Sequence, residues 1–201
     1  MTREWVWKTV LAAACLSACS PEATLLDIGA TGAVAASEER GFSATVGDTA
    51  TEMAVSTALL SHDVETFSQV SVQVYQGRVL LTGLVERPEM RVDAVRLAWQ
   101  ANGVREVINE IEVSDKGGLD SFAQDAWISS RLRSRLLLDK EIQSINYSIE
   151  VVDGTVYLMG LGRSAEEVAR VETHARNLPY VRRVVNYARV KDQAQSQGSG
   201  P

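Results

Sequence analysis

A constant offset of 77 residues relates the two halves of this chain, and this repeat constrains the fold more than any other feature. The segment Tyr75-Gln-Gly-Arg-Val-Leu-Leu-Thr-Gly83 returns as Val152-Asp-Gly-Thr-Val-Tyr-Leu-Met-Gly160, with both glycines in register. Other pairs at the same offset are Asp48 with Asp125, Leu59 with Leu136, Val107 with Val184, and Asn109 with Asn186. Because the register holds without a gap, we predict one folding unit that occurs twice.

Each copy begins with a helix and a hairpin. The first helices are expected near Asp48–Ser61 and Asp125–Leu138, and each is opened by an aspartate suited to N-capping. Alternating apolar residues then indicate two strands. We expect the turns of these hairpins at Gln76-Gly77 and Asp153-Gly154, because glycine there supplies the positive φ that a two-residue turn needs.

A second helix and a third strand complete each copy. The second helices are expected to start at Pro88 and Ser164, and the third strands to span residues 104–113 and 181–190. The economical packing for these elements is a small three-stranded mixed sheet with two helices on one face. The predicted fold class is therefore α+β, with two tandem units.

The apolar residues predict how the elements pack. The inward faces of the first helices are formed by Thr51, Val55 and Leu59 in one copy and by Ile128, Leu132 and Leu136 in the other. The open faces of the two sheets are apolar as well, with Tyr75 and Leu80 in one and Val152, Tyr157 and Met159 in the other. We therefore expect two cores, and two units that pack against each other.

The N-terminus has the features of an export signal. Arg3 and Lys8 form a basic region, an apolar stretch follows over residues 10–16, and Leu16-Ser17-Ala18-Cys19 stands where cleavage is expected. The apolar stretch is shorter than the roughly 20 residues of a spanning helix. The pattern resembles the bacterial lipobox, in which the cysteine is acylated and becomes the first residue. An ordinary secretory signal with a chance cysteine is the alternative.

The mature chain is expected to lack a pair of cysteines and to carry a net negative charge. Cys15 leaves with the signal and Cys19 carries lipid, so no disulfide is expected. Removal of residues 1–18 takes away two basic residues and one acidic residue, which changes the formal net charge from −6 to −7. Nucleic acid is an unsuitable partner for such a protein, because affinity for it comes mainly from neutralising phosphates.

The repeated motifs resemble the BON domain. That family has Gly-x-Val-x-Leu-x-Gly, then a helix, then Gly-Val-x-x-Val-x-Asn, which here is Gly103–Asn109; the second copy has Tyr180 in place of the glycine. Two such units behind a lipobox resemble the dual-BON outer-membrane lipoproteins. The resemblance covers residues 45–191 and the lipobox. It implies a lipid-anchored outer-membrane protein that faces the periplasm of a Gram-negative bacterium and supports the integrity of that membrane.

The chain divides into six segments on this basis. They are a lipoprotein signal peptide (1–18), the lipidated Cys19 with a flexible tether (19–46), BON domain 1 (47–114), a linker with a bend at Lys116-Gly117-Gly118 (115–123), BON domain 2 (124–191) and a disordered tail (192–201). The tether is rich in Ala, Gly, Thr and Ser, and the tail in Gln, Ser and Gly. Such compositions bury too little apolar surface to form a core.

The outer faces of the two first helices differ. The first copy has no basic residue there, whereas three arginines lie between Trp127 and Leu138. An indole and a leucine among guanidinium groups suit the boundary between lipid headgroups and acyl chains. The resemblance points to the same helix, because the first helix of the second BON unit contacts lipid in the family. A packed tryptophan with solvated arginines is the alternative. The residues assigned to anionic phospholipid are Trp127, Ile128, Arg131, Arg133, Ser134, Arg135 and Leu138.

A second candidate surface lies in the first copy. Val92, Val95 and Trp99 form an apolar stripe where the second copy has Ala169, Glu172 and Arg176. With Tyr75 on the open sheet face, they form a candidate interdomain or partner surface. The alternative function is therefore a protein–protein adaptor in the envelope, for example in the assembly of outer-membrane proteins.

An enzymatic function is not expected. His62 and His174 do not recur between the copies, and we find no His/Cys/carboxylate spacing typical of a metal site and no phosphate-binding glycine loop. No cofactor, metal or small-molecule substrate is predicted. The expected partners are anionic phospholipids at a membrane surface, with envelope proteins as a further class.

Overall fold

The computed structural model describes residues 42–114 and 119–191. The predicted signal peptide, Cys19, most of the tether, the bend at residues 116–118 and the C-terminal tail lie outside the described residues. The expectations for those segments therefore stay predictions.

The two units repeat one order of elements. The first unit consists of α2 (Phe42–His62), α3 (Val64–Phe67), β1 (Val70–Tyr75), β2 (Arg78–Val85), α4 (Pro88–Ala98) and β3 (Glu106–Val113). The second consists of α5 (Leu119–Leu138), the 3-10 turn η1 (Ser144–Asn146), β4 (Tyr147–Val152), β5 (Thr155–Gly162), α6 (Ala165–Arg176), β6 (Arg183–Asn186) and β7 (Arg189–Val190). Residues 119–123, which we had assigned to the linker, are therefore the first residues of α5.

Each unit has a mixed sheet. β1 pairs antiparallel with β2, which pairs parallel with β3, and β4, β5 and β6 repeat this arrangement. The predicted α+β class is confirmed. One difference is that the last strand of the second unit is interrupted between β6 and β7, both of which pair with β5. At the interruption, the Asn186 Oδ1 accepts the backbone N–H of Ala188 at 3.0 Å.

The two repeated aspartates have a role other than the predicted helix cap. Each first helix begins six residues before its aspartate, so Asp48 and Asp125 lie inside α2 and α5. The carboxylate of Asp48 accepts the backbone N–H groups of Gln76 at 2.7 Å and Gly77 at 2.9 Å. The prediction of N-capping is wrong, because the orphan donors that these carboxylates satisfy belong to the hairpin turn.

The second unit repeats this contact. Asp125 accepts from the backbone N–H groups of Asp153 at 2.7 Å and Gly154 at 2.8 Å. In both turns the two central residues have positive φ, from 46° to 73°. Such turns match the twist of the flanking strands, and they leave two N–H groups directed at the helix. The repeat therefore encodes a bond between helix and hairpin as well as a shared topology.

The glycines that close the motif allow a close backbone approach. A Cβ atom added at Gly83 would lie 2.0 Å from the carbonyl oxygen of Gln69, and one at Gly160 would lie 2.2 Å from that of Asn146. Gly83 also has a φ of +124° and Gly160 of +155°. Only glycine fits these positions without a shift of the neighbouring strand.

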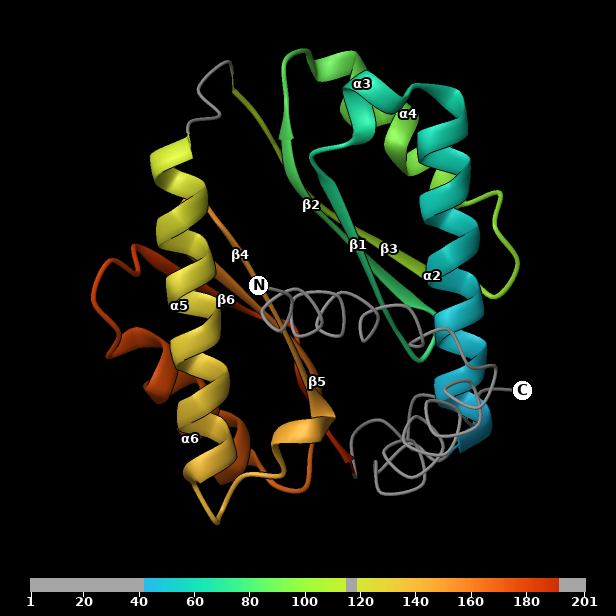
Figure 1. Cartoon of the computed structure of the whole chain (residues 1–201). Coiled ribbons are helices and arrows are strands. Elements are labelled where there is room, and N and C mark those ends of the chain that lie inside the picture. The colour runs from blue at the N-terminus through green and yellow to red at the C-terminus, as the bar shows by residue number, and fades with distance from the viewer. Residues whose placement is uncertain (1–41, 115–118, 192–201) are drawn as a thin grey trace, which may run out of the picture.

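Each unit has its own apolar core. The predicted inward faces are confirmed, because Val55, Leu59, Ile128, Leu132 and Leu136 are at most 1% exposed and Thr51 is also buried. They pack on the valines, leucines and isoleucines of one sheet face and on the second helix. Figure 1 shows the result as four layers, with α2 and α4 outside one sheet and α5 and α6 outside the other.

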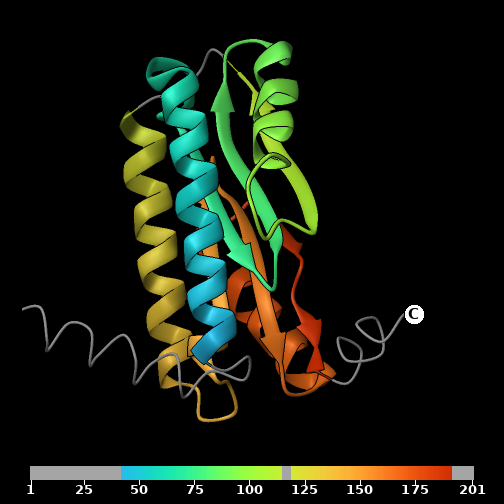
Figure 2. The same ribbon diagram turned by 90° about the vertical axis from the view of Figure 1, so that its right-hand side faces the viewer.

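The open faces of the two sheets pack against each other, as expected. Their contact is centred on a third apolar cluster of Tyr75, Leu80, Tyr157, Met159 and Leu161. α2 and α5 run in opposite directions on the two outer sides (Figure 1), and in the view along the stack of layers α5 appears next to α2 (Figure 2). The arrangement is that of two similar units related by an approximate two-fold axis.

Equivalent positions of the repeat meet at this axis. The Gln73 Nε2 donates to the Glu150 Oε2 at 2.9 Å, across 77 residues of sequence. On the other side of the apolar cluster, the Tyr187 hydroxyl donates to Glu110, again across 77 residues. Burial, followed by the bond to Glu110, raises the pKa of Tyr187, so the hydroxyl keeps its proton. These contacts fix the register of one unit on the other.

Two ion pairs join the units beside the axis, and in each the glutamate comes from the first unit and the arginine from the second. Glu106 pairs with Arg189, and Glu112 pairs with Arg183, each at 3.2 Å. Glu106 and Arg183 are equivalent positions of the repeat, and so are Glu112 and Arg189. A pairing of two first units would bring glutamates together, and a pairing of two second units would bring arginines together. The charges therefore favour the mixed pair over either homotypic pair.

Candidate functional site

The exposed side of α5 combines aromatic, aliphatic and cationic side chains. Trp127 is 44% exposed and Leu138 is 81% exposed, and Arg131 lies on the same side, one helical turn from Trp127. Leu137, which we had not assigned to this surface, is 73% exposed. The opposite side of α5 has its apolar residues at intervals of four and packs on β4, so helical geometry directs this group outward.

One assigned residue does not belong to this surface. Ile128 is fully buried in the core of the second unit, together with Leu132 and Leu136. Its neighbour Trp127 lies about 100° away around the helix and reaches solvent. The assignment of Ile128 to lipid contact is therefore wrong, because its side chain cannot reach a ligand without unfolding of the core.

The three arginines of α5 differ in their partners. Within the described ranges, Arg131 makes no hydrogen bond or ion pair. The Arg133 Nη2 donates to the carbonyl oxygen of Ile149 at 2.9 Å, and the Arg135 Nη1 donates to that of Asn177 at 3.3 Å. None of the three forms an ion pair with a carboxylate within that part of the chain, although Arg133 lies close enough to Glu150 for an electrostatic interaction. Ser134 is also exposed, and its hydroxyl donates to the Ser130 carbonyl oxygen at 2.9 Å.

Trp127 is both exposed and packed, which combines the two alternatives that the sequence left open. Its ring meets that of Tyr180 edge to face, with centroids 5.7 Å apart and an interplanar angle of 80°. Tyr180 lies between α6 and β6 and is 62% exposed. The sequence prediction missed this residue and treated it as a change at a turn. The available signal was the joint replacement of Ala50 and Gly103 by Trp127 and Tyr180 between the copies.

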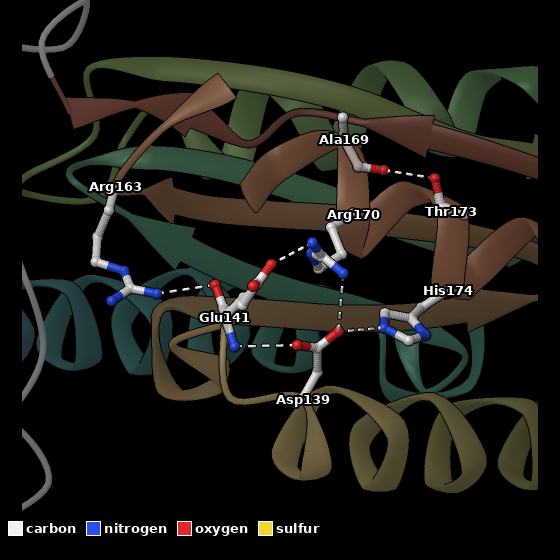
Figure 3. Close-up of polar contacts among 7 residues, drawn as sticks. All are labelled: Asp139, Glu141, Arg163, Ala169, Arg170, Thr173 and His174. Atoms are coloured by element: carbon white, nitrogen blue, oxygen red, sulfur yellow. Dashed lines mark hydrogen bonds and ion pairs between the residues drawn. The ribbon is translucent and has the colours of Figure 1, made fainter. Parts of the chain in front are cut away.

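A polar network fixes the C-terminal end of α5 on α6 (Figure 3). Asp139, directly after the helix, contacts the His174 Nε2 at 2.8 Å and accepts the backbone N–H of Glu141 at 3.0 Å. Arg170 pairs with both Asp139 and Glu141. The bond to His174, followed by that from the Glu141 backbone, lowers the pKa of Asp139. The network therefore holds the exposed Leu138 in place at the end of the helix.

A groove of about 770 Å³ lies on the other edge of α5, between the two units. Its lining includes Phe122, Arg133 and Glu150 from the second unit and Ser71 from the first. Burial raises the pKa of Glu150, against the effect of side-chain bonds with Ser71 and Gln73. The polar groups of the groove thus bond with one another across the two units, and they serve the contact between them.

The second candidate surface is only partly exposed. Val92 and Trp99 on α4 are 69% and 52% exposed, but Val95 packs against the first core. Tyr75 is 5% exposed and belongs to the apolar cluster between the sheets, so it is not available to a separate partner. The sequence prediction missed a further stripe on α2, where Val46, Met53 and Leu60 are exposed at intervals of seven residues.

The described residues have neither a cluster of metal ligands nor a membrane-spanning helix. No group of three or more His, Cys, Asp or Glu side chains in residues 42–114 and 119–191 is arranged to hold a metal ion. In the same ranges, no helix has the length and apolar character needed to cross a bilayer. What distinguishes the second unit is the aromatic and cationic outer side of α5.

Comparison with known proteins gives a family match for both units. A family model described as the BON domain matches residues 47–115 and 124–192. An Anaplasma centrale protein described as "Uncharacterized protein in gshII 5'region" is 40% identical to the chain over 147 residues, which are 73% of this chain and 96% of that protein.

Two relatives have more informative names. Osmotically-inducible protein Y of Escherichia coli (strain K12) is 31% identical over 146 residues, which are 72% of this chain and 73% of that protein. The outer membrane lipoprotein DolP of Haemophilus influenzae is 28% identical over 139 residues, which are 69% of this chain and 72% of that protein.

Proposed function

This chain belongs to the BON-domain family, and on that premise we propose that it is a non-catalytic envelope protein that binds anionic phospholipid through α5. In this proposal Cys19 carries a lipid anchor in the inner leaflet of the outer membrane, and the two units face the periplasm. The similarity to an outer membrane lipoprotein supports the location. Binding of the folded units to the membrane surface would help to maintain its integrity.

The observation that carries the proposal is the difference between α5 and α2. The exposed side of α5 has Trp127 and Leu138 together with Arg131 and Arg135, and Arg133 lies on the groove edge of the same helix. The equivalent side of α2 has no cation and no aromatic residue from Asp48 to Ser61. Each cation near an anionic surface contributes about 1 kcal/mol, and the indole favours the headgroup boundary. This local combination attracts anionic lipid in a chain whose net charge is negative.

The surface complements a single lipid anchor. One acyl chain gives only marginal, reversible membrane binding, so stable attachment takes a second signal. A weakly binding helix on the folded part supplies that signal, and it also orients the two units on the membrane. The proposed contact residues are Trp127, Arg131, Arg133, Ser134, Arg135 and Leu138, with Leu137 added and Ile128 removed.

Vesicle co-sedimentation tests the proposal. The mature chain with Cys19→Ser should sediment with vesicles that contain phosphatidylglycerol and remain in solution with phosphatidylcholine alone. Trp127→Glu should reduce binding at least about tenfold, because a carboxylate replaces an interfacial ring next to the arginines. The matched control is Ala50→Glu, which adds the same charge at the equivalent exposed position of the first unit. Failure of the parent chain to bind, or equal losses in both variants, would refute the proposal.

The exposed Val92 and Trp99 favour one rival function, a protein–protein adaptor in the envelope. Exposed apolar stripes commonly mark contact surfaces. A pull-down from detergent-solubilised envelope should then lose its partner on Trp99→Ala and keep it on Trp127→Glu. The reverse pattern, or retention of the partner by both variants, would count against this surface. The two functions are compatible, since lipid binding would place the adaptor.

A further inference from the structure

The turn between α6 and β6 holds an aromatic residue in a backbone conformation suited to glycine. Tyr180 has a φ of +70°, and Gly103 at the equivalent turn of the first unit has a φ of +90°. The other two non-glycine residues with positive φ in the described ranges, Gln76 and Asp153, are equivalent to each other. A bulky side chain in this region is an outlier that the surrounding structure must stabilise. A specific contact of the Tyr180 ring is therefore needed to stabilise this backbone conformation.

The ring of Tyr180 packs on Trp127, and this pair is absent from the first unit. Edge-to-face geometry with centroids 5.7 Å apart is a favourable aromatic arrangement. The position of Trp127 is Ala50 in the first unit, so both members of the pair are replaced by small residues there. Neither ring belongs to the core of the second unit, and both remain about half exposed. Core stability does not account for the pair.

We propose that Trp127 and Tyr180 together form an aromatic wedge that enters the headgroup boundary of an anionic phospholipid surface, so that the α6–β6 turn contacts lipid as well as α5. The inference rests on the proposed lipid-binding function. Tryptophan and tyrosine are the residues that favour this boundary, because each has an apolar ring and a polar group. Two rings that brace each other reach the surface as one rigid unit and lose little rotamer freedom on binding.

The charge around the wedge supports the choice of an anionic lipid surface. Arg131 lies one turn of α5 after Trp127, and Arg135 lies one turn further. The Arg135 guanidinium donates to the Asn177 carbonyl oxygen, three residues before Tyr180, and so joins α5 to the segment that carries the second ring. Cations and rings thus lie together, as recognition of a phosphate above an acyl layer requires.

Tryptophan fluorescence can follow the wedge directly. Trp5 and Trp7 are in the signal segment, so the mature chain has Trp99 and Trp127, and Trp99→Phe leaves Trp127 as the single tryptophan. In this background, with Cys19→Ser, phosphatidylglycerol vesicles should shift the emission of Trp127 to the blue, and brominated acyl chains should quench it. Tyr180→Gly should weaken vesicle binding about three- to tenfold, as expected for loss of one ring from the headgroup boundary. Tyr180→Phe should stay within about twofold of the parent, because it keeps the ring.

The variants separate a wedge from a purely structural role. Glycine occupies the equivalent turn of the first unit and suits a positive φ, so Tyr180→Gly should fold, which thermal unfolding checks. If Tyr180→Gly binds like the parent while Trp127→Glu loses binding, the wedge is refuted and the contact by α5 alone remains. If the parent does not bind vesicles, the wedge and the proposed function fail together. Loss of binding in Tyr180→Phe as well would refute the role of the ring pair.

Discussion

Replacement of Asp48 or Asp125 by alanine should destabilise the protein through the hairpin turn instead of the helix end. Each carboxylate accepts two backbone N–H groups at 2.7–2.9 Å, and Asp48 is 7% exposed. A hydrogen bond to a charged group contributes about 1.5–3 kcal/mol, and a buried donor without an acceptor adds a penalty. Alanine recovers about 0.6 kcal/mol of helix propensity. The expected net loss is about 2–4 kcal/mol for Asp48→Ala, and Asp48→Asn should lose less because its amide oxygen still accepts one bond.

Equilibrium urea unfolding measures this loss, and amide hydrogen exchange locates it. Protection should fall at the N–H groups of Gln76 and Gly77 in the Asp48 variant, and at those of Asp153 and Gly154 in the Asp125 variant. Thr49→Ala is the control, since Thr49 is exposed on the same helix and should change stability by less than about 0.5 kcal/mol. The reasoning is refuted if protection is lost in the first turn of the helix while the hairpin amides stay protected.

Three further predictions concern the contact between the units and the motif glycine. Burial raises the pKa of Glu150 above its ordinary 4.5. The protonated side chain therefore makes its full contribution to the free energy of unfolding at low pH, and this contribution is lost as the pH rises past that value. Glu150→Gln, which copies Gln73 of the first unit, should therefore gain stability relative to the parent as urea unfolding is moved from pH 4 to pH 7; a constant difference would contradict this. Glu112→Arg should destabilise the contact with Arg183, and Arg183→Glu in the same chain should restore it, with a coupling below about 1 kcal/mol that falls with salt; additive effects would contradict it. Gly83→Ala should lower the thermal midpoint by more than about 10 °C, since its Cβ would meet a carbonyl oxygen at 2.0 Å, and a normal midpoint would show that β1 can shift.

Tertiary contacts decided what the individual motif residues do. Asp48 and Asp125 occupy positions where a local rule predicts an N-cap, but both bond with a turn 28–29 residues further along the chain. Tyr180 looked like a substitution at a turn, and its partner Trp127 is 53 residues away. Local sequence rules describe neighbours within a few positions, so they cannot assign a partner that depends on how the elements pack.

Exposure at the candidate site was predictable in part. The helical period separated Leu132 and Leu136 from Arg131 and Leu138 correctly, because it depends only on geometry within one helix. The same period also places Ile128 inward, and it is buried. The exposure of Trp127 could not be read from the period, since it depends on the ring of Tyr180 that covers one side of the indole.

The sequence by itself determined the repeated unit, its α+β class and the inward helix faces, because a gap-free offset, alternating apolar residues and turn glycines are local signals. Only the tertiary structure decided how the two units pair. Equivalent residues such as Gln73 and Glu150 meet at an approximate two-fold axis, and Glu112 of the first unit meets Arg183 of the second. The physical reason is that symmetry relates whole surfaces, and a surface exists only after strands distant in sequence have been brought side by side.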